Sequence, residues 1–105
     1  MDGKITVKYL QNYIKQKDYH PELSKDYFLK LSEEVGELFR AMRKGLKAQD
    51  NENIKGTIDK ELWDVIYYAM AIANLYDIDL EQVIRIKEKM NQIRYPSPVA
   101  FEENR

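Results

Sequence analysis

Carboxylate side chains recur at helical spacing in two separate stretches of the chain. They are Glu33, Glu34 and Glu37 in the first stretch (LSEEVGEL), and Glu61 and Asp64 in the second (ELWD). Residues three positions apart project from the same side of a helix, so each stretch would present a pair of carboxylates. Two such pairs facing each other across packed helices repel strongly unless a cation lies between them. Oxygen ligands suit Mg²⁺ or Mn²⁺ better than zinc, so the spacing favours a magnesium site.

Hydrophobic periodicity indicates how these acids lie relative to a core. Glu61 falls on one helical stripe with Val65 and Tyr68, where the pattern predicts a buried residue. Glu34 lies about 40° from Leu38 around its helix and therefore borders the apolar face. Buried carboxylates are costly unless they are paired or bound to metal. Two ordinary solvated helices remain the alternative, because EExxE strings are common on helix surfaces.

Four helices are expected to carry these acids, and no strand pattern of any strength is present. The first helix follows Thr6 as its cap, and the second runs roughly from Pro21 to Lys44 and ends at Gly45. The third helix follows the cap Thr57 and runs to about Tyr76. The fourth helix is capped by Asp77 or Asp79 and ends at Tyr95. A polar loop, residues 47–55, separates the second helix from the third. The third helix is apolar on most sides, which predicts central burial or contact with a partner subunit.

Length and charge limit the remaining possibilities. The 105 residues suffice for one domain, with an N-terminal helix and loop at 1–20, a core at 21–96 and a loose tail at 97–105. Lys and Arg number 17 against 18 Asp and Glu, so no net charge favours a nucleic acid polymer or a membrane as partner. The absence of cysteine excludes disulfides and thiol chemistry. Neither a signal peptide nor a membrane-spanning run is visible, so a cytoplasmic protein is expected.

Three ordered motifs resemble those of the MazG-like nucleotide pyrophosphohydrolases. They are KLSEEVGEL at residues 30–38, ELWDVIYYAMAIANLYDIDLEQV at residues 61–83, and Lys87, Asn91, Tyr95 and Pro96, which fit the family's KxxxNxxxYP string. This family belongs to the all-α NTP pyrophosphatase superfamily, with the dimeric dUTPases and the phosphoribosyl-ATP pyrophosphatases. The resemblance implies an all-α, four-helix domain that completes a larger helical bundle by homo-oligomerisation, as a dimer or a tetramer.

The resemblance also implies a reaction, namely hydrolysis of a nucleoside triphosphate between its α and β phosphates to give monophosphate and pyrophosphate. Carried over by position, Glu34, Glu37, Glu61 and Asp64 would hold Mg²⁺, with Mn²⁺ as a possible substitute. Glu33 would stand behind these ligands or act as the base for the attacking water. A metal that bridges the phosphates would neutralise charge and orient the water, which is most of what this hydrolysis requires.

The sequence indicates the residues that would contact the substrate less specifically than it indicates the metal ligands. Lys87 and Asn91 are one turn apart and would contact phosphate oxygens, with Tyr95 nearby, although Lys87 could equally be a solvent-exposed charge. Lys30 could also reach phosphate. Trp63 could stack on a nucleobase, but a tryptophan on an apolar helix more often lies in a core or a subunit interface.

Two further readings remain open. Within the enzyme class, the substrate could be narrower, such as dUTP, dCTP or phosphoribosyl-ATP, rather than a range of non-standard or excess nucleotides removed in house-cleaning. In another class, the chain could form a non-catalytic helical homodimer that binds metal in a regulatory role. The nucleotide-hydrolysing enzyme is the interpretation that the three motifs favour.

Overall fold

A computed structural model describes residues 3–47 and 53–102, and all of the regular structure in those ranges is helical. The helices are α1 (Val7–Lys17), the short 3-10 helix η1 (Pro21–Leu23), α2 (Ser24–Lys44), α3 (Ile58–Leu75) and α4 (Leu80–Arg94). The prediction of an all-α chain with four main helices is therefore confirmed in this part of the molecule. Most of the predicted polar loop, residues 48–52, and the last three residues of the predicted tail lie outside the described residues.

The predicted caps explain where the helices begin and end. Thr6, Thr57 and Asp79 each accept a hydrogen bond from a backbone N–H in the first turn of α1, α3 and α4, respectively. Gly45 ends α2 with a φ of 67°, a left-handed conformation that glycine adopts without a steric penalty. These contacts satisfy backbone groups that a helix end otherwise leaves unpaired.

The start of the second helix differs from the prediction. The segment that begins at Pro21 first forms the 3-10 turn η1, and the α-helix starts only at Ser24. The N–H of Leu23 donates to the carbonyl of His20, which closes this tighter turn. Such turns are frequent at helix N-termini, where α-helical hydrogen bonds are not yet available.

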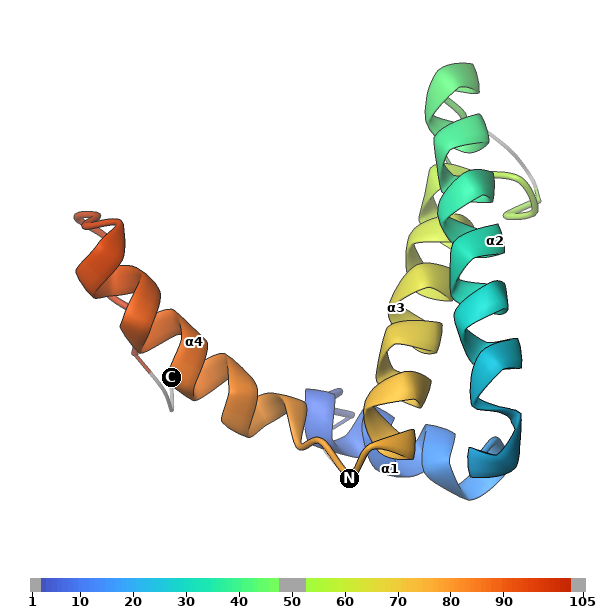
Figure 1. Cartoon of the computed structure of the whole chain (residues 1–105). Coiled ribbons are helices and arrows are strands. Elements are labelled where there is room, and N and C mark those ends of the chain that lie inside the picture. Colours follow the sequence, from blue (N-terminus) through green and yellow to red (C-terminus); the bar gives the residue numbers. More distant parts are fainter. Residues whose placement is uncertain (1–2, 48–52, 103–105) are drawn as a thin grey trace.

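The helices α2 and α3 lie side by side and run in opposite directions, and α1 crosses beneath one end of this pair (Figure 1). The buried core lies where the three helices meet and contains Ile14, Tyr27, Met70 and Ala71. No helix in the described part of the chain is both long enough and apolar enough to cross a membrane.

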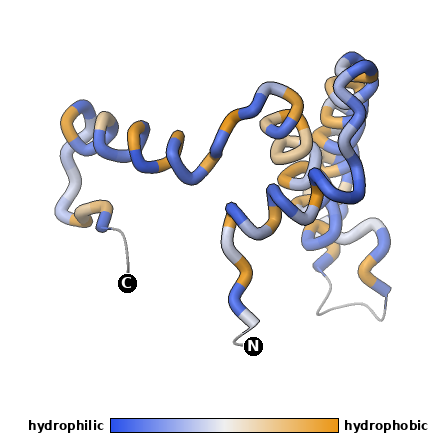
Figure 2. The backbone as a smooth tube through the Cα atoms, turned by 90° about the horizontal axis from the view of Figure 1, so that it is seen from below, coloured by the Kyte–Doolittle hydropathy of each residue, from blue (hydrophilic) through white to orange (hydrophobic). Residues whose placement is uncertain are grey.

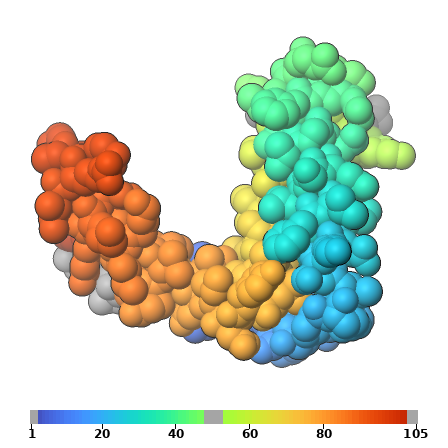
Figure 3. All heavy atoms as spheres, viewed as in Figure 1, coloured from blue at the N-terminus to red at the C-terminus, as the bar shows by residue number. Residues whose placement is uncertain are grey.

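The last helix, α4, leaves this unit instead of packing along it. The space-filling view shows α4 as an arm that stands apart from α2 and α3 (Figure 3). Apolar residues recur along this arm (Figure 2), yet none of the residues of α4 is buried. Ile86 is 53% exposed and Ile93 is 84% exposed. A second uncovered apolar face lies on α3, where Leu62 and Ile66 are exposed.

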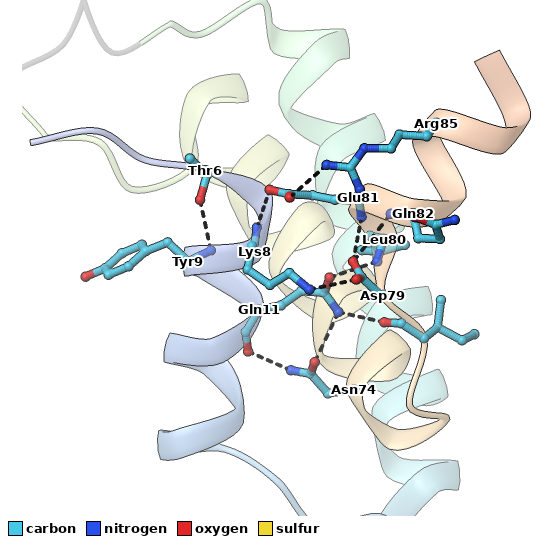
Figure 4. A network of polar contacts seen from close by, with 11 residues as sticks. Thr6, Lys8, Tyr9, Gln11, Asn74, Asp79, Leu80, Glu81, Gln82 and Arg85 are labelled. Atoms are coloured by element: carbon cyan, nitrogen blue, oxygen red, sulfur yellow. Dashed lines mark hydrogen bonds and ion pairs between the residues drawn. The ribbon is translucent and has the colours of Figure 1, made fainter. Parts of the chain in front are cut away.

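A buried polar contact fixes the base of the arm. Gln11 of α1 donates to the carbonyl of Ile78 and accepts from the N–H of Leu80, so its side chain binds the turn that joins α3 to α4. Its amide also donates to Asn74, whose own amide donates to the backbone carbonyl of Gln11 (Figure 4). Gln11 and Asn74 are 5% and 7% exposed, so these hydrogen bonds replace water at groups that would otherwise be buried unpaired.

Candidate metal centre

The start of α3 is fixed beside the end of α2, and this contact places the two acidic stretches near each other. The side chain of Thr57 is almost fully buried, and its hydroxyl donates to the carbonyl of Ile54 at 2.5 Å. The N–H of Ile58 donates to the carbonyl of Leu46, which follows α2, at 2.7 Å. The first turn of α3, which carries Glu61, therefore has a defined position against α2.

Three carboxylates from the two helices converge. One oxygen each of Glu34, Glu61 and Asp64 lies within 4.8 Å of the others. Glu61 is only 4% exposed, as the hydrophobic periodicity predicts, whereas Glu34 and Asp64 are half-buried. Burial, followed by the negative charge of Asp64, raises the pKa of Glu34 above its ordinary value. We refer to these three residues as the acid cluster.

One oxygen of the acid cluster lacks a hydrogen-bond partner. Among the described residues, nothing donates to the buried Oε1 of Glu61. An unpaired buried carboxylate oxygen is costly, and a divalent cation bound by oxygen ligands would remove this cost. The residues present therefore fit Mg²⁺ or Mn²⁺ in number, chemistry and burial.

A lysine contacts the acid cluster from the same helix. The ammonium of Lys60 lies 2.6 Å from Oδ2 of Asp64 and 3.6 Å from Oε2 of Glu61. The hydrogen bond to Asp64 is the main cause that raises the pKa of Lys60. One ammonium among three carboxylates leaves the group with a surplus of negative charge when all three are ionised.

The other two predicted acids lie outside the cluster. Glu37 is half-buried on α2, and its carboxylate pairs with the guanidinium of Arg40 one turn later. Glu33 is exposed and lies 3.7 Å from the ammonium of Lys30. The structure thus brings together three of the four predicted ligands, and it places Glu33 on the solvent side of α2.

A pocket of about 170 Å³ opens beside the acid cluster. Tyr27, Lys30 and Tyr68 line it, together with residues of the segment before α2. Tyr68 lies one turn after Asp64 on α3, and burial raises the pKa of its hydroxyl. Lys30 likewise lies one turn before Glu34 on α2, so two of the lining residues are one helical turn from the acid cluster.

The carboxylate of Asp18 accepts hydrogen bonds from two tyrosines, one of which lines this pocket. Asp18 accepts a hydrogen bond from the hydroxyl of Tyr27 and another from the hydroxyl of Tyr67, each at 2.8 Å. Burial and these bonds raise the pKa of Tyr27 to about 12 and also raise the pKa of Tyr67. Both tyrosines are therefore neutral donors under ordinary conditions.

The predicted phosphate-binding residues lie on the separate arm. Lys87 donates to the side-chain oxygen of Asn91 at 3.1 Å, and Tyr95 is 64% exposed at the end of α4. Because α4 points away from α2 and α3 (Figure 1), these residues do not meet the acid cluster of their own chain. Trp63 is 38% exposed and packs edge-on against Tyr67, with ring centroids 6.0 Å apart.

Sequence reasoning missed two of these site residues. Asp18 stands in a polar segment between helices, where nothing in its neighbours indicates two tyrosine donors. Lys60 immediately precedes Glu61 and is four residues before Asp64, which is the spacing of an intrahelical ion pair. That spacing was available from the sequence and could have identified Lys60 as a neighbour of the metal ligands.

Comparisons with known proteins show the family to which the chain belongs. The family model for the MazG nucleotide pyrophosphohydrolase domain matches residues 23–97. The crystal structure of Ntag-iMazG from Vibrio DAT 722 is similar, with 42% identity, a TM-score of 0.81 and coverage of 89% of this chain and 100% of that chain. A crystal structure of Ctag-iMazG from the same source gives 44% identity and a TM-score of 0.79, covering 84% of this chain and 99% of that chain. The search of curated proteins gives no match. The chain belongs to the MazG nucleotide pyrophosphohydrolase family.

Proposed function

We propose that the protein hydrolyses nucleoside triphosphates, including deoxyribonucleotides, to monophosphate and pyrophosphate in a reaction that depends on Mg²⁺. The observation that carries the proposal is the acid cluster, with the unpaired buried oxygen of Glu61, in a chain of this family. The activity would serve house-cleaning of the nucleotide pool, and the cytoplasm is its proposed location.

The residues of the acid cluster would hold the metal, with Mn²⁺ as a substitute for Mg²⁺. Glu37 could join Glu34, Glu61 and Asp64 if its carboxylate leaves Arg40, which is a change of side-chain rotamer. A bound divalent ion supplies neutralisation of phosphate charge and a lowered pKa for coordinated water. Glu33, which is exposed on α2, would stand behind these ligands or accept a proton from the attacking water.

The pocket beside the acid cluster is the proposed place for the nucleoside. The hydroxyl-bearing rings of Tyr27 and Tyr68 offer apolar faces with a polar edge, a combination that suits a base or a sugar. Lys30 lies at the same pocket and could contact a phosphate oxygen. Trp63 is a candidate for base stacking from a neighbouring turn of α3, since its ring is partly exposed.

We further propose that the site is completed in a homodimer or tetramer. The arm α4 and the exposed face of α3 leave two apolar surfaces uncovered on each chain. A second copy offers the same two surfaces, so mutual coverage would bury both without a different partner. In such an assembly, Lys87, Asn91 and Tyr95 of one copy could contact phosphate bound at the acid cluster of the other.

The direct test is a panel of eight ribo- and deoxyribonucleoside triphosphates with and without Mg²⁺, in which products are separated by ion-exchange chromatography. The proposal expects monophosphate and pyrophosphate, with no turnover in EDTA. Asp64→Asn should lose at least about 100-fold in rate, because it removes a proposed metal ligand. Asp59→Asn, an exposed acid on the same helix, should keep the parent rate.

The pattern of products also separates the other readings. Diphosphate with orthophosphate would mean that a different bond is hydrolysed. Turnover of a single nucleotide, such as dUTP or dCTP, would indicate a narrow pyrophosphatase. Metal binding without turnover of any substrate would favour the non-catalytic dimer.

A further inference from the structure

The acid cluster contains a cation of its own, the ammonium of Lys60. It lies within ion-pair distance of two of the three cluster carboxylates, at 2.6 Å from Asp64 and at 3.6 Å from Glu61. The Lys60 side chain is 39% exposed, whereas those of Asp64 and Glu61 are 23% and 5% exposed. The lysine therefore reaches the carboxylates from the solvent side.

The ion pairs of Lys60 change the net charge of the acid cluster. With all three carboxylates ionised, the acid cluster carries three negative charges, and the ammonium of Lys60 offsets one of them. Without this offset, three carboxylates whose oxygens lie within 4.8 Å of one another would repel strongly. A divalent ion bound by the same carboxylates would be repelled by an ammonium that lies 2.6 Å from Asp64 and 3.6 Å from Glu61.

The lysine is free to leave without unfolding its helix. Its ammonium is held through a flexible side chain that is partly in water, so a new rotamer would place the charge in solvent. The backbone of Lys60 would stay in place, because its N–H donates to the cap residue Thr57. Exchange of one cation for the other therefore requires a side-chain movement only.

We propose that Lys60 is a resident counter-cation of the acid cluster, which stabilises the cluster without metal and which a divalent ion must displace in order to bind. Lys60 thereby weakens metal binding and sets the concentration range in which the site fills. The inference rests on the proposed metal centre, since it concerns the regulation of that same site.

Isothermal titration of the full chain with MnCl₂ tests this inference directly. Lys60→Met keeps the length of the side chain but removes the charge, and it should bind Mn²⁺ about tenfold more tightly than the parent. Lys60→Arg keeps the charge and should stay near the parent affinity. Lys8→Met is the matched control, since Lys8 forms an ion pair of the same 2.6 Å length with Asp79 at the start of α4.

A second readout uses the protein without metal. In EDTA, Lys60→Met should unfold at a lower temperature than the parent, because the carboxylates lose their counter-charge, and added Mn²⁺ should restore more stability than it gives the parent. Equal or weaker Mn²⁺ affinity in Lys60→Met would overturn the inference and leave the metal centre standing. A parent and variants that all fail to bind Mn²⁺ would overturn the metal centre and this inference together.

Discussion

At the scale of single residues, the acid cluster contains groups that are unfavourable for the stability of the folded protein. Glu61 is 4% exposed with an unpaired oxygen, and the neighbouring Glu34 has a raised pKa because of burial and the charge of Asp64. A carboxyl whose folded-state pKa is raised favours folding only while it is protonated, so ionised Glu34 opposes folding near neutral pH. Such unfavourable groups are expected at functional sites rather than in a purely structural core.

Replacing Glu61 with glutamine should therefore stabilise the protein in the absence of metal. The change removes a buried charge while it keeps the shape of the side chain, and we expect a gain of about 1 kcal/mol in EDTA. The same variant should lose the stabilisation that Mg²⁺ gives the parent. Thermal unfolding in EDTA and in MgCl₂ measures both effects, with Glu22→Gln, an exposed acid within η1, as the control.

Tyr27 and Tyr67, which donate hydrogen bonds to Asp18, predict how the free energy of unfolding changes at alkaline pH. The pKa of Tyr27 is raised from 10.0 to about 12 in the folded protein, so the folded state binds more protons between these values. The stability that this proton provides is complete below pH 10 and is lost as the pH rises towards 12, by up to about 1.4 kcal/mol per pH unit.

Tyr27→Phe isolates this contribution. At pH 8 the variant should be less stable than the parent by about 1 kcal/mol, because the hydrogen bonds of the hydroxyl are lost. Urea unfolding at pH 8, 10 and 11 should show the difference shrinking as the pH rises. A difference that stays constant with pH would contradict the raised pKa.

At the scale of helices, the contact between Gln11 and Asn74 connects the arm α4 to the rest of the fold. These amides bind each other and the turn at Ile78 and Leu80, while no residue of the arm itself is buried. Lys8 of α1 adds hydrogen bonds to Asp79 and Glu81 at the same end of α4. The direction in which the arm leaves α3 therefore depends on contacts at its base, of which the amide network is the buried part. Removing the Gln11 side chain would leave its three partners in this network without their hydrogen bonds to it.

Gln11→Leu should destabilise the protein by roughly 2–4 kcal/mol, because it leaves Oδ1 of Asn74, the carbonyl of Ile78 and the N–H of Leu80 without these partners. Gln16→Leu is the control, since Gln16 is an exposed glutamine on the same helix. Urea unfolding followed by circular dichroism gives both free energies of unfolding. Similar values for the two variants would show that the network contributes little.

The sequence predicted the elements better than the positions of individual side chains. Thr6, Thr57, Asp79 and Gly45 mark helix ends through local hydrogen bonds, and so they can be recognised without tertiary structure. The burial of Glu61 followed from the same local periodicity. Glu37 and Arg40 have the i, i+3 spacing of an intrahelical ion pair, but the sequence does not decide whether the carboxylate of Glu37 binds Arg40 or a metal ion.

The sequence contains one indication of the buried hydrogen bonds of Gln11, namely a polar residue at a core position. Gln11 lies on the stripe that Val7 and Ile14 define, so a polar residue occupies a core position there, as Glu61 does on the third helix. The partner of Gln11 is more than 60 residues away in Asn74, and nothing local identifies it. Long-range pairing of this kind requires the packed structure.

At the scale of the whole molecule, a single chain does not cover its own apolar surface. The arm presents Ile86 and Ile93, and α3 presents Leu62 and Ile66, all of them exposed. Uncovered apolar patches of this kind are typical of association surfaces, and we propose that a second copy of the chain covers them in a symmetric oligomer. The proposed phosphate contacts on α4 give that association a role in the site.

The protein should therefore have a mass in solution of at least twice the 12.5 kDa of one chain. Ile86→Glu places a charge on the apolar side of α4 and should shift the protein towards the monomer and reduce turnover with it. Gln82→Glu, at an exposed polar position of the same helix, should leave the mass unchanged. Light scattering after size exclusion decides between these outcomes, and a monomeric parent would contradict the shared site.

The most direct test of the central claim compares the parent with Glu61→Gln on the best substrate of the nucleotide panel, at a fixed Mg²⁺ concentration. The parent should release equal amounts of monophosphate and pyrophosphate, and the variant should lose roughly 100-fold or more in rate while remaining folded in circular dichroism. An Mg²⁺-dependent parent rate that Glu61→Gln leaves unchanged would contradict the assignment of the acid cluster as the metal centre.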